Sequence, residues 1–124
     1  MPQYFSPEEA NSMLDVIRPT VEEIMRIHQR VVERQPEAWP AIERAAGNGG
    51  NRAASALVPE FEKLRSLMQV LKEQGVIVKD MSVGLLDFPS LRDGREVYLC
   101  WKYGEDRVAF WHDVDAGFAG RQPL

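Results

Sequence analysis

The second half of the sequence interleaves ionisable and aromatic side chains densely enough to form a binding site. Six of them make up the candidate ligand-binding set: Asp87, Trp101, Glu105, Trp111, His112 and Arg121. Aromatic rings provide binding area, and an imidazole beside a carboxylate orients a polar ligand or moves a proton. The same residue types also serve structure alone, because ionisable groups at strand ends are usually solvated. The sequence therefore names candidate binding residues and leaves catalysis undecided.

A metal site would use the same region. His112, Asp113 and Asp115, together with the more distant Asp87 or Glu105, offer enough nitrogen and oxygen donors. Their spacing is not a recognised ligand motif, and the chain has a single cysteine. We therefore expect neither a bound metal nor another cofactor.

The tail, residues 113–124, carries a third possible site. Glycines bracket Phe118, so we expect the tail to fold back with this ring as an anchor and to bring Arg121 toward His112 and Glu105. Arg121 then either pairs with a carboxylate of the tail, Asp113 or Asp115, as a structural clasp, or offers its planar donors to a carboxylate or phosphate ligand. Structural ion pairs are the commoner case, so the clasp is the expected one.

The charge balance argues against two classes of partner. The 124 residues include 15 Lys and Arg against 19 Asp and Glu, a formal net charge of -4, so nothing attracts phosphate backbones or anionic lipids. Aromatic strand residues could stack bases, but such surfaces are normally flanked by Lys and Arg, and here acidic groups outnumber the basic ones. No apolar run approaches the roughly 20 residues of a membrane helix. We expect no nucleic acid, no membrane and a cytoplasmic location.

The first element is a long helix with a clear start. Ser6 is a typical N-cap, Pro7 suits the first turn, and Glu9 completes a capping box. An apolar seam then runs to about Arg34. Pro19 removes one backbone donor, which predicts a kink at that point.

A second helix follows over about 52–74 and ends at Gly75, so residues 7–74 predict an antiparallel helical hairpin. Between the helices, residues 35–46 indicate a shorter helical piece and residues 47–51 a flexible glycine-rich connection. No strand precedes this connection, as a phosphate-binding loop would require.

After Gly75 the periodicity changes to that of an antiparallel meander over residues 76–112. The expected strands cover residues 76–78, 83–88, 95–102 and 107–112. Asp93-Gly94 is the strongest turn signal and predicts a two-residue hairpin, in which Asp87 lies opposite Cys100.

This register gives the sheet two unlike faces. One packs on the helices and carries Leu86, Phe88, Val97, Leu99, Trp101, Val108 and Phe110. The opposite face carries Leu85, Asp87, Tyr98, Cys100, Lys102 and Trp111. A two- or four-residue turn at 104–106 preserves the assignment, whereas a three-residue turn would flip the last strand. His112 then lies on the face away from Cys100, so we expect Cys100 to be a small packed residue and not a nucleophile.

The face away from the helices predicts an interface through Leu85, Tyr98 and Trp111. An exposed apolar and aromatic patch usually marks a contact surface, and a two-fold dimer is the commonest way to bury it. We therefore expect a homodimer or larger homo-oligomer, working as a non-enzymatic interaction protein. The alternative is a protein that binds a small anionic metabolite, or a minor enzyme, with its site near Trp111 and His112.

Several short motifs carry a family resemblance over nearly the whole chain. In chain order they are Tyr4-Phe5-Ser6, Val78-Lys79-Asp80, Gly84 to Pro89, Val97 to Trp101, Gly104-Glu105, Trp111-His112 and Gly117 to Arg121. With these motifs the sequence resembles domain-of-unknown-function family 2203, a prokaryotic family. The resemblance implies a small stand-alone bacterial protein and no assigned activity, cofactor or catalytic residue.

The elements together predict one α+β domain over residues 1–124. The helical hairpin packs on a three- to four-stranded antiparallel sheet, and the tail follows. A chain of this length buries roughly two thirds of its unfolded surface, so it needs no metal or disulfide staple.

Overall fold

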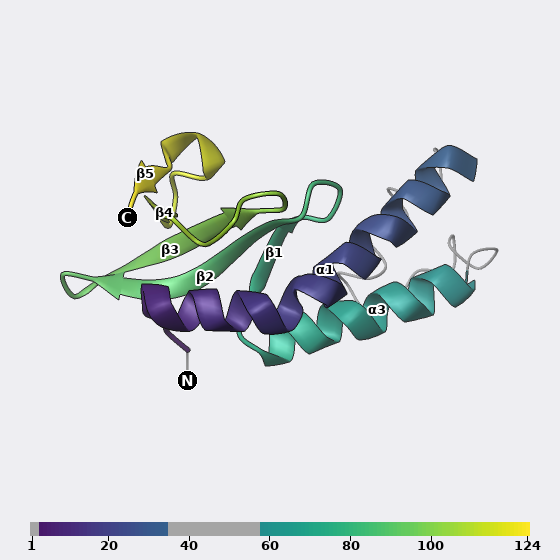
Figure 1. Cartoon of the computed structure of the whole chain (residues 1–124), viewed down its shortest axis with the longest axis horizontal. Helices are drawn as coiled ribbons and strands as arrows, with labels where there is room; N and C mark the ends of the chain where they lie inside the picture. Colours follow the sequence, from purple (N-terminus) through teal and green to yellow (C-terminus); the bar gives the residue numbers. More distant parts are fainter. Residues whose placement is uncertain (1–2, 35–57) are drawn as a thin grey trace.

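The computed structural model describes residues 3–34 and 58–124 (Figure 1). The helical piece expected at 35–46, the connection at 47–51 and the expected start of the second helix lie outside these residues. Within them the chain has the predicted α+β fold, with two α-helices and a five-stranded antiparallel sheet. No helix in the described ranges has an apolar stretch long enough to cross a membrane.

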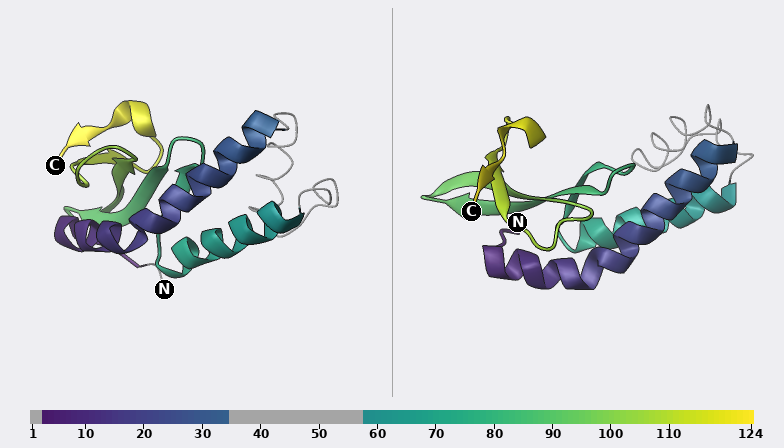
Figure 2. Two further views of the ribbon diagram at one scale, coloured as in Figure 1. Left: turned by 45° about the vertical axis from the view of Figure 1, so that its right-hand side comes forward. Right: turned by 45° about the horizontal axis from the view of Figure 1, so that its top comes forward.

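Helix α1 (Pro7–Arg34) begins and ends where its sequence predicts. The Glu9 amide donates to Ser6 Oγ at 3.1 Å and the Ser6 amide donates to Glu9 Oε1 at 2.8 Å, which completes the capping box. Hydrogen bonds from Ser6, that of its backbone amide first, lower the pKa of Glu9. The helix continues through Pro19, and its ribbon bends midway along its length (Figure 2).

Helix α3 (Val58–Glu73) runs beside α1 in the opposite direction and leads into the sheet (Figures 1 and 2). The Glu23 carboxylate of α1 joins the two helices, because Lys63 Nζ of α3 lies 2.8 Å from its Oε1 and Arg26 lies 2.7 Å from its Oε2. Hydrogen bonds from Lys63 and then Arg26 lower the pKa of Glu23 to about 2.

The strands form a meander in the order β1-β2-β3-β4-β5. Their bounds are β1 (Ile77–Asp80), β2 (Leu85–Arg92), β3 (Arg95–Lys102), β4 (Phe110–Asp113) and β5 (Gln122–Pro123). The fifth strand exceeds the predicted number because the tail, after the short 3-10 helix η3 (Phe118–Gly120), pairs with β4.

The β2–β3 hairpin has the predicted register, with Asp87 opposite Cys100. Asp93 and Gly94 have φ angles of 54° and 77°, as the predicted two-residue turn requires. We call the face with Phe88, which the helices cover, the inner face. The face with Asp87 and Cys100 is the outer face.

The register of β4 corrects the sequence prediction. Trp111 pairs with Leu99 and His112 pairs with Tyr98. Because paired residues share a face, Trp111 lies on the inner face, while Phe110 and His112 lie on the outer face. The prediction that placed Trp111 on the outer face and Phe110 on the inner face is wrong.

A contact with α1 explains the shift. Asn11 of α1 accepts a hydrogen bond from the Val108 amide at 2.7 Å and donates one to the Val108 carbonyl at 3.2 Å. These bonds hold Val108 against the helix, where it is buried, and keep it out of the strand. Strand β4 therefore begins at Phe110, and the connection of residues 103–109 has an odd length, which reverses the alternation.

The core lies between the inner face and the helices. Its strand residues include Leu86, Phe88, Val97, Leu99, Trp101 and Trp111. The ring of Phe5 meets that of Phe88 edge-on, with centroids 5.4 Å apart. The C-terminal segment lies on the side of the sheet away from α1, so it is the tail that approaches the outer face (Figures 1 and 2).

Candidate functional site

The six candidate binding residues separate into three pairs. Trp101 and Trp111 are buried in the core on the inner face, so they do not line a site with His112. His112 meets Asp87, with Nε2 and Oδ1 3.1 Å apart. Arg121 meets Glu105, with Nη2 2.8 Å from each carboxylate oxygen. The tail thus folds back as expected, but Arg121 pairs with Glu105 and not with a carboxylate of the tail.

Three adjacent strands bring Asp87, Cys100 and His112 together on the outer face. Asp87 comes from β2, Cys100 pairs with it on β3, and His112 follows on β4 one diagonal step away. Their exposed fractions are 1%, 1% and 2%. One ligating atom of each side chain lies within 4.8 Å of the other two, and this is the one such group of three that the described part of the chain forms.

His112 is fixed by both ring nitrogens. Nδ1 lies 2.7 Å from the carbonyl oxygen of Asp113. Because a carbonyl only accepts, Nδ1 carries the hydrogen, and in a neutral ring the lone pair of Nε2 points into the cluster. Nε2 and Asp87 Oδ1 are then both acceptors, so a hydrogen bond between them requires a second proton, on the imidazole or on the carboxylate. The ring of Tyr98 packs edge-on against His112, with centroids 5.7 Å apart.

The two oxygens of the Asp87 carboxylate differ in their hydrogen-bond partners. Its Oδ2 is buried and has no hydrogen-bond partner among the residues that the structure describes. Lys79 Nζ lies 4.0 Å away, which is too long for a hydrogen bond, and this ammonium also lies over the Tyr98 ring. The Lys79 side chain is 43% exposed, so solvent weakens its attraction for the carboxylate.

Cys100 lacks the features of a nucleophile. Burial, followed by the negative charge of Asp87, raises the pKa of its thiol to about 12, so little thiolate exists at neutral pH. A nucleophilic triad also places the imidazole between the thiol and an orienting carboxylate. In this protein a backbone carbonyl orients His112, and Nε2 alone faces the cluster.

A clasp closes the outer face on the β4–β5 side. Besides holding Arg121, the Glu105 carboxylate accepts the Lys102 amide at 2.7 Å. The Arg121 guanidinium lies 4.1 Å from the centroid of the Phe110 ring and 4.7 Å from that of Phe118. Nη2 is therefore engaged by both Glu105 oxygens, whereas Nε is buried without an acceptor in the described ranges.

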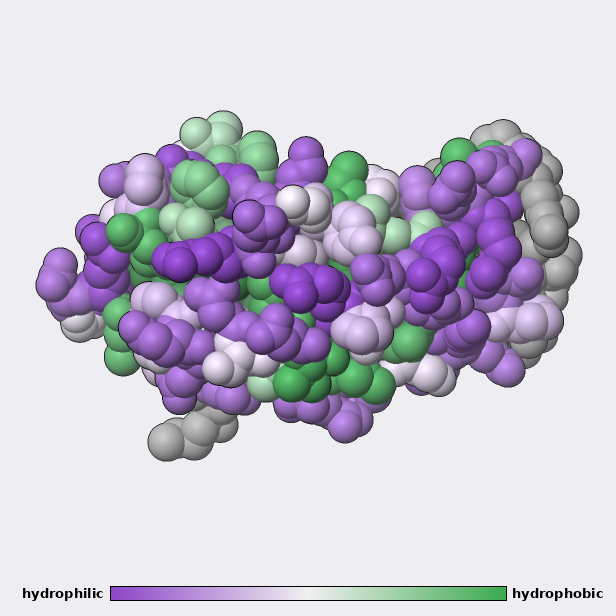
Figure 3. All heavy atoms as spheres, in the orientation of Figure 1, coloured by the Kyte–Doolittle hydropathy of each residue, from purple (hydrophilic) through white to green (hydrophobic). Residues whose placement is uncertain are grey.

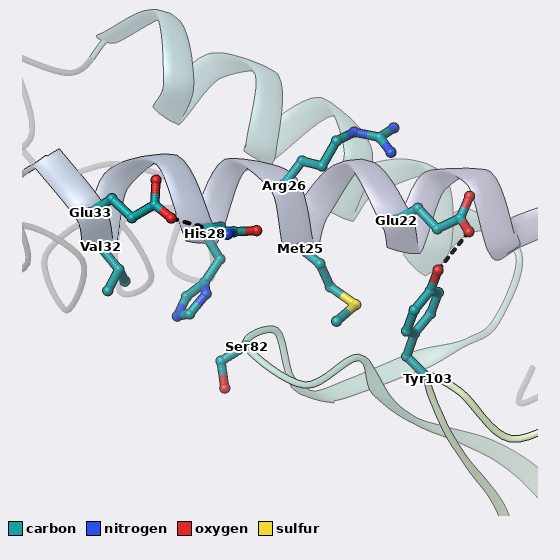
Figure 4. A pocket seen from close by; sticks show the side chains of 9 residues that line it. Glu22, Met25, Arg26, His28, Val32, Glu33, Ser82 and Tyr103 are labelled. Atoms are coloured by element: carbon teal, nitrogen blue, oxygen red, sulfur yellow. Dashed lines mark hydrogen bonds between the residues drawn. The ribbon is translucent and has the colours of Figure 1, made fainter.

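A separate hollow lies between α1 and the loops around Ser82 and Tyr103, with a volume of about 540 Å³ (Figure 4). None of the six candidate residues lines it. Four of its polar groups pair with one another: Tyr103 donates to Glu22 at 2.7 Å, and Gln29 donates to Glu33 at 3.0 Å. The buried side-chain atoms without a partner in the described ranges belong to Asp87 and Arg121, neither of which lines the hollow.

Cys100 belongs to the outer-face cluster with Asp87 and His112, although the sequence did not indicate it as a site residue. The error followed from the register of β4, because that register decides whether Cys100 and His112 share a face. The sequence held no signal that settled this register: it allowed a two-, three- or four-residue turn near Gly104, and only the odd length gives the observed pairing.

Comparison with known proteins adds one match. The profile of a family described as "Uncharacterized conserved protein (DUF2203)" covers residues 3–124. No curated protein and no solved structure matches the chain.

Proposed function

This chain belongs to the DUF2203 family of uncharacterized conserved proteins, and we propose that it is a non-enzymatic binding protein for a cation, held on the outer face by Asp87 and His112. The observation that carries the proposal is Oδ2 of Asp87, buried and without a hydrogen-bond donor in the described residues. Burying a carboxylate without full compensation costs several kcal/mol. A bound cation supplies the missing charge.

A cation fits this face better than the anionic metabolite expected from the sequence. The guanidinium of Arg121, the group best suited to an anion, is bound to both oxygens of Glu105. The groups that face the cluster are a carboxylate, a thiol and an imidazole nitrogen, all of which can act as donors to a cation.

Binding is a better account than catalysis. Without a bound cation, the raised pKa of Cys100 leaves little thiolate at neutral pH, and the cluster is almost closed to solvent. A catalytic group must reach its substrate, whereas a bound ion can be enclosed.

Self-association through the outer face remains a prediction with less support. Its expected contacts were Leu85, Tyr98 and Trp111, and Trp111 is buried on the inner face. On the side of the molecule in Figure 3, hydrophilic side chains separate several small hydrophobic areas. Light scattering of the full chain at micromolar concentration, with Tyr98→Ser as the variant, tests the remaining contacts: a monomer at high concentration would reject them.

The cation proposal is tested by thermal unfolding of the full chain after treatment with a chelator and dialysis. Zn²⁺, Mn²⁺, Ca²⁺ and Mg²⁺ are added separately, and at least one should raise Tm, since a ligand at 100 times its Kd stabilises by about 2.7 kcal/mol. Asp87→Asn should abolish the shift. Asp15→Asn, on the exposed side of α1, should retain it.

Equilibrium dialysis with elemental analysis provides the stoichiometry, which should be one cation per chain. Failure of all four cations to bind, or binding that survives in Asp87→Asn, would reject the proposed function.

A further inference from the structure

The outer-face cluster has the donor set of a thiophilic metal site. Cys100 offers a sulfur, His112 a nitrogen and Asp87 two oxygens. Zn²⁺ and similar ions take sulfur, nitrogen and carboxylate donors in tetrahedral sites, whereas Ca²⁺ and Mg²⁺ take six or more oxygens. Two oxygens from one carboxylate are too few for the second class.

The second contact of His112 is the one that metal-ligating histidines make. Such histidines donate their other ring N–H to a carboxylate, a backbone carbonyl or water, which fixes the tautomer and the ring orientation. In this protein Nδ1 lies 2.7 Å from the carbonyl oxygen of Asp113. The lone pair of Nε2 therefore points at the position that a metal would occupy.

The Asp87 carboxylate provides an observation, independent of the donor set, that points to a bound ion. Its side chain is 1% exposed, and its Oδ2 has no hydrogen-bond partner within the described ranges. When both carboxylate oxygens bind the ion, three residues provide four donor atoms, and the unpaired oxygen is satisfied.

Charge balance also favours this ion. A Zn²⁺ ion with one thiolate, one carboxylate and a neutral imidazole has no net charge, which suits a cluster that solvent barely reaches. A coordinated thiol is deprotonated outright, so Cys100 contributes the thiolate charge in this balance.

The distances require a modest closure of the side chains. Bond lengths of about 2.1 Å to nitrogen and 2.3 Å to sulfur place tetrahedral donor atoms about 3.6 Å apart. His112 Nε2 and Asp87 Oδ1 are already 3.1 Å apart, and the widest separation in the group is no more than 4.8 Å. The most widely separated donor atoms must therefore approach each other by about 1 Å, which side-chain rotation on a rigid sheet can provide.

From these observations we propose that the cation is a Zn²⁺-class transition-metal ion, held by Cys100 Sγ, His112 Nε2 and the Asp87 carboxylate. The inference rests on the proposed function and names its ligand. The ion ties β2, β3 and β4 together on the face that the helices do not cover. Three protein residues hold the ion, and the remaining coordination position is taken by the second Asp87 oxygen or by water.

The test is titration of the chelator-treated full chain with Co²⁺, followed by absorption spectroscopy. Because the chain has one cysteine, a thiolate-to-cobalt charge-transfer band in the near ultraviolet reports Cys100 alone. We expect this band, together with the intense visible bands of tetrahedral Co²⁺, to saturate at one equivalent and to disappear on addition of Zn²⁺.

Variants identify the remaining ligand and protect the test against misfolding. Cys100→Ser should lose the charge-transfer band, and His112→Gln should weaken Co²⁺ binding at least tenfold while circular dichroism shows a folded chain. His28→Gln replaces the other histidine of the chain, on α1, and should bind Co²⁺ as the parent does.

The outcomes separate the two proposals. Cation binding that depends on Asp87 but gives no thiolate band, or that Cys100→Ser leaves unchanged, overturns the metal assignment and leaves the cation function standing. Absence of binding by every cation overturns both.

Discussion

Each face of the sheet buries side chains from β2, β3 and β4, but the two sets are buried for different reasons. Alternate residues of β2–β4 point inward as Phe88, Leu99 and Trp111 and outward as Asp87, Cys100 and His112. The inner side chains gain free energy simply by leaving water. The outer side chains lose their hydration on burial. Contacts with one another or with a ligand must offset that free-energy cost. One face therefore stabilises the fold, and the other is where a function is to be sought.

The largest effect should come from the inner face. Phe88→Ala removes a ring that is 0% exposed and in contact with Phe5, and it should lower the free energy of unfolding by about 3–5 kcal/mol. Urea denaturation measures the loss. Leu91→Ala, 53% exposed on the outer face of β2, is the control and should cost less than about 0.5 kcal/mol. Similar costs for the two variants would contradict the division between the faces.

Loss of the clasp on the outer face should have an intermediate effect. Arg121→Ala removes two hydrogen bonds between charged groups and leaves Glu105 without its cationic partner, which should cost about 1–3 kcal/mol in urea denaturation. Arg95→Ala breaks a more exposed ion pair with Asp113 and should cost no more than about 1 kcal/mol. If Arg121→Ala lowered the free energy of unfolding less than Arg95→Ala does, the tail would not be a structural clasp.

Thiol reactivity shows how well the outer face is closed. Without a bound metal ion, the pKa of Cys100 is raised from 9.0 to about 12 in the folded chain, so iodoacetamide at pH 8 should alkylate the chelator-treated native protein at least about tenfold more slowly than the urea-unfolded protein. The native rate should still be rising at pH 10. Equal rates in the two states would mean that the cluster is open to solvent.

The smallest effect is expected far from the sheet, at the contact between the helices. The pKa of Glu23 is lowered from 4.5 to about 2 by Lys63 and then Arg26, so its contribution to stability is complete above pH 4.5 and is lost as the pH falls toward 2. Glu23→Gln should therefore lose less stability than the parent over that interval. Glu33→Gln on the same helix is the control. Parallel curves for parent and Glu23→Gln would reject the role of this carboxylate.

Local signals predicted most of the fold. Ser6 and Glu9 fix the start of α1 through bonds three residues apart, and Asp93-Gly94 fixes the β2–β3 register by its turn geometry. Each of these depends on neighbours in the sequence, so the residues themselves carry the information.

The site could be predicted only in part, because contacts between distant residues assemble it. Asn11 binds Val108, 97 positions later, and this bond decides the face on which His112 lies. Arg121 folds back as its flanking glycines predict, but it meets Glu105, whose carboxylate also binds the Lys102 amide. Neither pairing has a spacing that a sequence motif would record.

An anomalous difference map at the zinc absorption edge, from a crystal of the full chain grown with Zn²⁺, would locate the proposed ion directly. A zinc ion in the outer-face cluster should give a peak about 2.3 Å from Cys100 Sγ and about 2.1 Å from His112 Nε2, with Asp87 as the third ligand. Zinc bound only at surface residues, with no peak between these three side chains, would contradict the metal assignment.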